Sequence, residues 1–325
     1  MSKTSTDLVR HALNGPTMGT RWSALFHAPR GLEADIARKA LQAAVDEVDA
    51  QMSTWKPDSD LNRLNGALVG EWVTVPASLM DVLRLALAVG KASDGAFDVG
   101  MGDAVTAWGF GPSAAAPDLI RTAMAARRVP AHEAIELGDG SVRKQAPLAL
   151  DLNGIAKGYG VDRLAETLAR LGIRHALVGI DGEMRAIGSK PDGEAWTVAV
   201  EQPDPARRAP HSILSLQDCA VATSGDYRHW VEVQGRRLSH TMDPRRGAPL
   251  LDAPASVTVL APTCAAADAW ATALMVLGPR KGGELARKVG IDALFLLRGE
   301  GDGIRSCGIG QVFGDGQAAT ATAGS

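Results

Sequence analysis

Apolar residues recur at helical spacing in several stretches of the chain. In each stretch they fall at every third or fourth position, which marks one buried face of an amphipathic helix. Gly172 and Gly290 follow the last apolar positions of two stretches, as is typical of helix C-termini. The pattern predicts helices over residues 33–52, 78–92, 161–171, 265–277 and 282–289.

Short runs rich in Val, Ile and Leu lie between these helices and predict strands. The dipeptide Gln234-Gly235 separates two such runs and indicates a two-residue hairpin turn. Helices and strands interleave without a strict β-α-β rhythm, which favours an α+β fold over a doubly wound parallel sheet. The predicted strands are 21–26, 176–180, 197–201, 231–233, 236–239, 256–261 and 293–297.

Composition is compatible with an enzyme and excludes several other classes. A chain of 325 residues that is 46% hydrophobic can bury a large core. The net charge of −3 comes from mixed acids and bases, so no basic face for nucleic acid is indicated. The three cysteines lie far apart with no CxxC pair, which favours free thiols over a disulfide framework or a zinc site.

The apolar runs and the N-terminal sequence indicate the cellular compartment of the protein. No run approaches the roughly 18 apolar residues of a membrane span, and residues 1–14 lack the apolar core of a signal peptide and a lipid-bearing cysteine. We therefore expect a cytoplasmic protein, or a periplasmic one if the N-terminus was trimmed. Residues 1–13 are treated as an extension, 14–313 as one domain, and the small, polar 314–325 as a disordered tail.

The most informative segment is 151–162, which reads DLNGIAKGYGVD before a predicted helix. Glycines at a helix N-terminus expose N–H groups at the positive end of the helix dipole, and Lys157 adds a cation, so a phosphate is indicated. Asp151 suggests a metal or a second polar group of a nucleotide. The segment matches neither the P-loop nor the dinucleotide fingerprint, so a tight turn with solvated charges stays open.

Two further segments carry candidate catalytic chemistry. His240 follows the predicted hairpin and could project its imidazole into a cleft as a general base, or be held by the turn at Asp243. Asp268 and Thr272 are four apart on one helix face and offer the oxygen ligands that Mg²⁺ prefers. Alternatively, Thr272 bonds to the Asp268 carbonyl while the carboxylate faces solvent.

Aromatic residues next to turns could hold a planar heterocycle. Phe97 and Asp98 end the turn at 93–98, and Trp55 offers another stacking face, although loops use such residues without a ligand. Met18 lies in a turn before the predicted strand 21–26.

Seven segments, taken together and in order, resemble the ApbE family of FAD:protein FMN transferases over residues 14–300. They are TMGT, MSTWKPDSDLNRLN, DGAFDVG, DLNGIAKGYGVD, VATSGDYR, HTMDPRRG and ADAWATAL. The resemblance implies an α+β fold of two mixed lobes packed into one compact unit, with FAD in the cleft between them and Mg²⁺ at its diphosphate. It also implies transfer of FMN to a Thr or Ser hydroxyl of a target flavoprotein, with release of AMP.

The resemblance assigns roles residue by residue. His240 takes the position of the catalytic histidine. Residues in FAD-contacting positions are Met18, Trp55, Ala96, Phe97, Asp98, Asp151, Lys157 and Met242. Positions of the magnesium site are Asp268, Thr272 and the backbone carbonyl of Gly154.

The chain also departs from the family pattern. Trp55 stands where tyrosine is usual, and Asn153 replaces a frequent glycine. Arg246 replaces a threonine, and the turn at Gly179 and Asp181 usually reads asparagine and glycine. Ala271 lacks a carboxylate that some members carry, so the resemblance leaves one or two metals open.

Three alternatives remain at the level of sequence. A FAD pyrophosphatase would use water in place of the protein hydroxyl and release FMN and AMP. A non-catalytic flavin-binding module would need neither His240 nor the pair Asp268 and Thr272. A flavoprotein oxidoreductase is disfavoured by the lack of a nicotinamide fingerprint. The expected target carries its Thr or Ser on a short loop among small residues, and no pattern indicates an oligomeric state.

Overall fold

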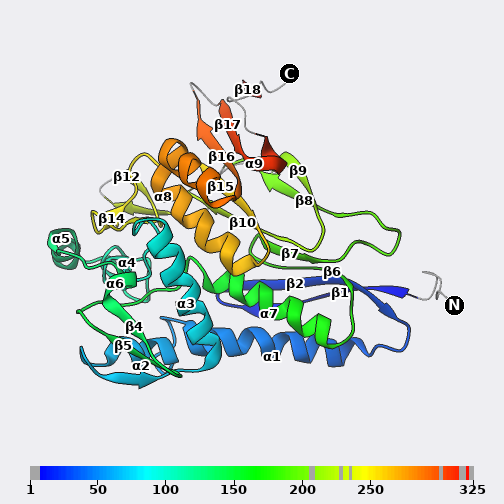
Figure 1. The fold of residues 1–325 in the computed structure, drawn as a ribbon, viewed down its shortest axis with the longest axis horizontal. Helices are drawn as coiled ribbons and strands as arrows, with labels where there is room; N and C mark the ends of the chain where they lie inside the picture. Colours follow the sequence, from blue (N-terminus) through cyan, green and yellow to red (C-terminus); the bar gives the residue numbers. More distant parts are fainter. Residues whose placement is uncertain are drawn as a thin grey trace.

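A large antiparallel sheet forms the centre of the molecule (Figure 1). The structure, a computed structural model, describes residues 8–204, 209–226, 230–233, 236–299, 303–314 and 320–321. Within these ranges the sheet has nine strands, and neighbouring strands run antiparallel. In spatial order they are β1 (Leu8–Thr17), β2 (Thr20–Pro29), β6 (His175–Ile180), β7 (Glu183–Ile187), β10 (Ala220–Gly225), β15 (Ser256–Ala261), β16 (Asp292–Arg298), β17 (Ile304–Ile309) and β18 (Thr320–Ala321).

Helices cover one face of this sheet and a two-stranded sheet covers the other. The helices are α1 (Ala34–Met52), α7 (Ala156–Arg170) and α8 (Cys264–Val289). Strands β15 and β16 alternate between two cores, because Val257 and Phe295 pack with α8 while Leu294 and Leu296 pack with the opposite sheet. That opposite sheet pairs β8 (Trp196–Glu201) with β9 (Pro210–Leu216).

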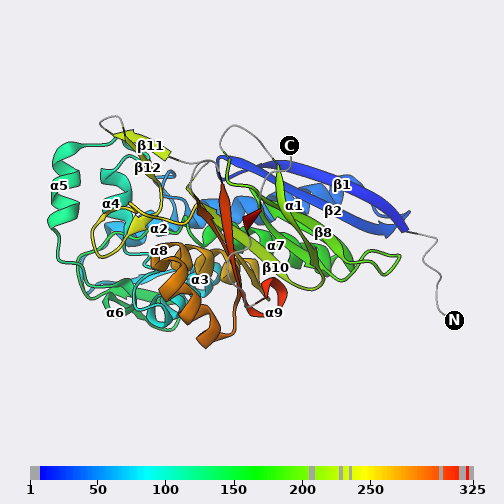
Figure 2. The same ribbon diagram turned by 90° about the horizontal axis from the view of Figure 1, so that it is seen from above.

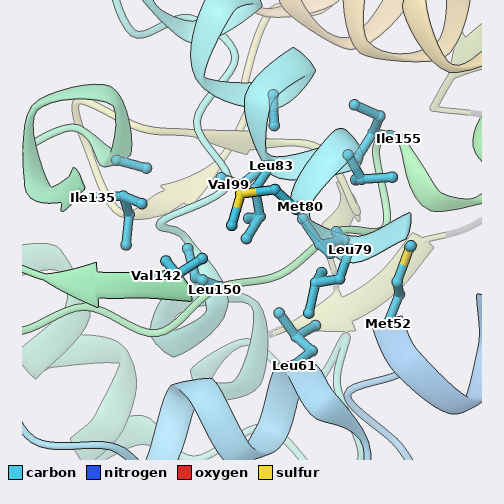
Figure 3. Packing of buried hydrophobic residues seen from close by; sticks show 14 of the residues in the cluster. Met52, Leu61, Leu79, Met80, Leu83, Val99, Ile135, Val142, Leu150 and Ile155 are labelled. Carbon is cyan, nitrogen blue, oxygen red and sulfur yellow. The ribbon is translucent and has the colours of Figure 1, made fainter. Parts of the chain in front are cut away.

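The segment between α1 and α7 forms a separate group of small elements at one end of the molecule (Figure 1). Leu61, Leu79, Leu83, Val142 and Leu150 are fully buried there and pack together with residues of α8 (Figure 3). The elements are α2 (Asp60–Gly66), β3 (Trp72–Thr74), α3 (Ala77–Ala92), α4 (Gly102–Ala107), α5 (Pro117–Ala125), α6 (Ala131–Ala134), β4 (Ile135–Leu137) and β5 (Ser141–Lys144).

Two short hairpins lie at the same end, beside α4 and α5 (Figure 2). They are β11 (Trp230–Val233) with β12 (Arg236–Ser239), and β13 (Met242–Asp243) with β14 (Ala248–Pro249). The predicted turn Gln234-Gly235 lies outside the described residues. Helix α9 (Gly310–Phe313) follows β17. No helix in the described ranges is long and apolar enough to cross a bilayer.

The predicted α+β class is confirmed, and several elements differ from their predicted bounds. Helix α7 begins at Ala156 rather than at Val161, because two of the motif's glycines lie inside the helix. The predicted helices 265–277 and 282–289 are two parts of α8, separated by Gly278, whose φ is 71°. That backbone conformation, followed by Pro279, breaks the helical path.

Residues near both ends of the chain form strands of the large sheet. Residues 8–13, which we placed in an N-terminal extension, belong to β1 and pair with β2. Their polar and apolar residues alternate weakly, as an edge strand allows, which explains why the pattern missed them. Most of the expected tail 314–325 lies outside the described residues, but its residues 320–321 form β18 and pair with β17.

Asp162 of α7 joins three elements near the centre of the molecule. Its two carboxylate oxygens accept hydrogen bonds from the N–H groups of Cys264 and Ala265, both at 2.9 Å. These N–H groups belong to the N-terminal turn of α8, where the helix offers no partner for them. The carboxylate also lies 2.6 Å from Nη1 of Arg185 on β7.

Replacing Asp162 by alanine is therefore expected to lower the free energy of unfolding by roughly 3 kcal/mol, because it leaves buried donors and Arg185 without their acceptor. Urea unfolding followed by tryptophan fluorescence measures this loss. The control is Asp81→Ala, which removes an exposed ion pair to Arg84 and should cost less than about 1 kcal/mol. Equal losses in the two variants would contradict the anchoring role of Asp162.

Candidate functional site

One cavity of about 1360 Å³ opens between the first turn of α7, the N-terminal half of α8, the β6–β7 turn and the segments around residues 96–110 and 240–244. Every residue to which the resemblance assigns a role lines it. These residues are Met18, Trp55, Ala96, Phe97, Asp98, Asp151, Gly154, Lys157, His240, Met242, Asp268 and Thr272. The structure thus brings together side chains that the sequence separates by up to 254 positions (18 to 272).

The glycines of the segment 151–162 allow close packing around the start of α7. A Cβ atom on Gly158 would overlap the carbonyl oxygen of Cys264 and lie 2.8 Å from Cβ of Asp268. A Cβ on Gly160 would lie 2.9 Å from Ile180, and one on Gly154 would lie 3.1 Å from Oγ1 of Thr272. These glycines therefore bring α7 against α8 and β6, a role that the phosphate interpretation of the motif did not include.

The substitution Gly158→Ala tests this packing. The added methyl group must separate α7 from α8, so we expect the free energy of unfolding to fall by about 1–3 kcal/mol. On the hypothesis that Asp268 binds Mg²⁺, we also expect the affinity for this ion to weaken as Asp268 moves. Urea unfolding and calorimetric Mg²⁺ titration measure the two effects. The control is Gly66→Ala at the end of α2, where the new Cβ meets no atom within 4 Å and stability should hold or rise slightly. An alanine at position 158 that changes neither quantity would contradict the close contact.

Asp268 and Thr272 both face the cavity from α8. Asp268 is only 5% exposed, and its Oδ2 accepts a hydrogen bond of 3.0 Å from the N–H of Gly158. The alternative in which this carboxylate faces solvent is therefore wrong. Burial raises the pKa of Asp268 to about 7, the Glu183 carboxylate adds to the rise, and Lys157 opposes it.

The oxygen atoms around Asp268 fit a hard divalent cation. The hydroxyl of Thr272 lies 3.3 Å from the hydroxyl of Ser224 and close to the backbone of Gly154. A buried carboxylate with a raised pKa is a group whose charge a cation would neutralise. No cluster of three or more His, Cys, Asp and Glu side chains suited to a metal occurs in the described ranges. This donor set suits Mg²⁺, which commonly takes one or two carboxylates and completes its shell with water and phosphate.

Lys157 is held by carboxylates from the β6–β7 turn. Its Nζ lies 3.1 Å from Oδ2 of Asp181 and 3.2 Å from Oε1 of Glu183. Burial alone would lower the pKa of Lys157, but the carboxylates of Glu183, Asp268 and Asp181 outweigh it and raise this pKa. Lys157 is thus a cation fixed at the cavity wall.

The sequence reasoning missed Glu183, although a local signal was present. Asp181 and Gly182 join β6 to β7 with φ values of 53° and 113°. Two consecutive residues with positive φ form the tight hairpin turn for which Asp-Gly is a favoured dipeptide. Such a turn after the predicted strand 176–180 places Glu183 directly beyond the hairpin tip, at the cavity wall. Burial raises the pKa of Glu183, and the Lys157 ammonium opposes that rise.

Met18 occupies a similar turn between β1 and β2. Met18 and Gly19 have φ values of 44° and 70°, and positive φ is uncommon for a side chain as long as methionine. The turn places the thioether over α7, where its Cε would lie 3.1 Å from a Cβ on Gly160. Backbone strain of this kind concentrates at ligand-binding sites.

His240 lines the cavity and belongs to a separate loop. Its ring meets that of Phe110 edge-on, with centroids 6.4 Å apart. The loop that follows is anchored by Nε1 of Trp108, which donates to the carbonyl of Gly247 at 3.0 Å. Phe110 thus contacts the predicted catalytic histidine, and Trp108 anchors the loop that follows it.

The other predicted FAD-contacting acids also organise the cavity wall. Oδ1 of Asp98 accepts hydrogen bonds from the N–H groups of Gly100 and Ala131 at 2.8 and 3.1 Å, and burial raises the pKa of Asp98. Asp151 accepts from the N–H and the amide of Asn153, and burial raises its pKa to about 6. Trp55 is 61% exposed at the rim, so its indole face is open to a ligand.

Comparison with known sequences agrees with the site geometry. The sequence profile of the ApbE family matches residues 18–295. The chain is 36% identical to a FAD:protein FMN transferase of Klebsiella pneumoniae over 301 residues, which cover 90% of this chain and 86% of the relative. It is 38% identical to a FAD:protein FMN transferase of Vibrio cholerae over 294 residues, which cover 88% and 87%.

Solved structures also show similarity to the ApbE family. The flavin transferase ApbE from Vibrio cholerae superposes with a TM-score of 0.83 at 33% identity, covering 93% of this chain and 97% of that one. The flavinyl transferase ApbE from Pseudomonas stutzeri, solved in its apo form, has a TM-score of 0.84 at 36% identity, with coverage of 95% and 98%.

Proposed function

This chain belongs to the ApbE family, and from that premise we propose that it transfers the FMN half of FAD to a Thr or Ser hydroxyl of a target flavoprotein. The product is a phosphoester between FMN and the protein, and AMP is released. The observation that carries the proposal is the single cavity lined by every residue expected to contact FAD, the metal and the reacting hydroxyl.

The residues of the cavity suit the parts of this substrate. Trp55, which is exposed, offers an aromatic face to a planar ring, and the largely buried Phe97 lines the cavity from the core. Lys157 and the N-terminus of α7 provide positive charge for the diphosphate. Asp268, Thr272 and the carbonyl of Gly154 would hold Mg²⁺, which when bound neutralises diphosphate charge and activates the phosphorus toward attack.

The transfer itself is a displacement at phosphorus. The hydroxyl oxygen of the target attacks the phosphorus on the FMN side, and the bond from that phosphorus to the oxygen of AMP breaks. His240 accepts the proton of the attacking hydroxyl, since neutral imidazole is a competent base near pH 7. The edge contact with Phe110 orients the ring for this task.

The nearest competing activity is FAD hydrolysis, in which water replaces the target hydroxyl. Chromatography of the small-molecule products distinguishes the two. With FAD, Mg²⁺ and an acceptor domain, a transferase releases AMP without matching free FMN, whereas a pyrophosphatase releases both in equal amounts. Intact FAD bound to the protein, with no products after several acceptors have been tried, would indicate a flavin-binding module.

A further inference from the structure

Glu183 is a buried acid with one oxygen paired to Lys157 and one without a hydrogen-bond partner among the described residues. Its side chain is 6% exposed, and Oε1 lies 3.2 Å from Nζ of Lys157. Its Oε2 is buried and has no hydrogen-bond partner among the residues that the structure describes. Glu183 lines the cavity together with Lys157 and Asp268.

A buried carboxyl oxygen without a hydrogen-bond partner lowers the stability of the fold by roughly 1–3 kcal/mol or more, unless a ligand supplies the missing hydrogen bond. A phosphate oxygen is a poor partner for the ionised carboxylate, because both groups only accept hydrogen bonds and carry like charge. A hydroxyl group suits the carboxyl in either protonation state, since it can donate to a carboxylate and accept from a carboxylic acid. The lysine next to Glu183 is the cation expected to face the diphosphate, so the hydroxyl must lie close to that diphosphate.

We propose that Oε2 of Glu183 binds a sugar-alcohol or ribose hydroxyl of FAD next to the diphosphate. This inference rests on the proposed function, because it takes FAD as the ligand. FAD offers two such sources: the ribityl chain on the FMN side and the ribose on the AMP side. Glu183 thereby selects a nucleotide that carries hydroxyls beside its phosphates, while Lys157 and Mg²⁺ bind the phosphates themselves.

A matched pair of variants separates the contribution of Oε2 to ligand binding from effects that act through Lys157. Glu183→Met removes it together with one carboxylate next to Lys157. Asp181→Asn also removes one carboxylate next to Lys157, at 3.1 Å, but leaves Glu183 intact, and asparagine tolerates the positive φ of this position. Any effect that acts through Lys157 or through phosphate charge is therefore shared by both variants. Glu183→Ala serves as a second variant if the methionine variant does not fold.

The measurement is calorimetric binding of three probes in the presence of Mg²⁺: FAD, ADP and inorganic pyrophosphate, which has no hydroxyl. We expect Glu183→Met to weaken FAD binding, relative to pyrophosphate, by about ten-fold or more, as the loss of a hydrogen bond to a charged group predicts. Asp181→Asn should change the affinities for FAD and for pyrophosphate by the same factor. If Glu183→Met weakens the binding of ADP as much as that of FAD, the hydroxyl belongs to the ribose. If ADP binding changes only as much as pyrophosphate binding, the hydroxyl belongs to the ribityl chain.

If Glu183→Met and Asp181→Asn change the affinities for the three probes in the same way, the proposal is overturned and Glu183 is left as a positioning residue for Lys157. Failure of the unaltered protein to bind FAD would instead overturn the proposed function. The two failures are therefore distinguishable.

Discussion

The substitution Asp268→Asn is expected to lower FMN transfer by at least roughly 10²-fold and to remove its dependence on Mg²⁺. The amide keeps the shape of the side chain, and its oxygen can still accept the hydrogen bond from Gly158, so the contact between α7 and α8 persists. What is lost is the buried negative charge that would attract a divalent cation. Bound metal contributes several kcal/mol of charge stabilisation to such reactions, which corresponds to this loss of rate.

The rate of FMN transfer is measured against Mg²⁺ concentration for both proteins. Asp81→Asn is the control, because it alters an exposed acid on α3 that does not line the cavity, and its profile should match that of the unaltered protein. Full Mg²⁺-stimulated transfer by the Asp268 variant would place the metal elsewhere. A melting temperature measured in parallel checks that the fold is intact.

The substitution His240→Ala is expected to lower the rate of transfer by about 10²–10⁴-fold, the usual contribution of a general base, while FAD affinity stays close to that of the unaltered protein. The reason is that His240 acts on the proton of the attacking hydroxyl rather than on FAD. Single-turnover transfer and FAD binding, measured on the same preparation, separate the two effects. Added imidazole should restore part of the rate, because it can occupy the space beside Phe110.

The control for this variant is His211→Ala on β9, a partly buried histidine that does not line the cavity. Its transfer rate should be unchanged. Unchanged turnover in the His240 variant would remove His240 from the mechanism. Equal losses of turnover and FAD affinity would make it a binding residue.

Elements with strong periodicity could be predicted from the sequence. Helices α1 and α3 agree with their predicted ranges within a residue, and β15 agrees exactly in position with the predicted 256–261. In these segments local periodicity and tertiary burial favour the same structure. The edge strand β1 was missed, since an edge strand can tolerate the weak alternation of its residues.

The glycine-rich segment shows why the rest could not be predicted. Its glycines suggest an irregular turn, and so the predicted helix began too late. The structure shows Gly158 and Gly160 inside α7, where they permit contact with α8 and β6. The contact with α8 depends on residues more than 100 positions away in sequence, because Gly158 meets Cys264 and Asp268.

The candidate site was predicted from a resemblance far more than from spacing. Asp268 and Thr272, taken alone, favoured a carboxylate that faces solvent while Thr272 bonds to the Asp268 carbonyl. The burial of Asp268 and its hydrogen bond from Gly158 exclude a solvent-facing carboxylate. Glu183 was missed because its partner Lys157 precedes it by 26 residues and lies on another element. The Asp-Gly turn that places it was visible in the sequence, but its meaning depends on the neighbouring helix.

The intact mass of an acceptor domain, measured after incubation with this protein, FAD and Mg²⁺, tests the central claim most directly. A parallel sample contains EDTA. The account predicts a mass increase equal to one FMN phosphoester, which is lost in the EDTA sample and in the Asp268→Asn variant. An acceptor of unchanged mass, with FMN and AMP free in solution, would contradict transfer and establish hydrolysis instead.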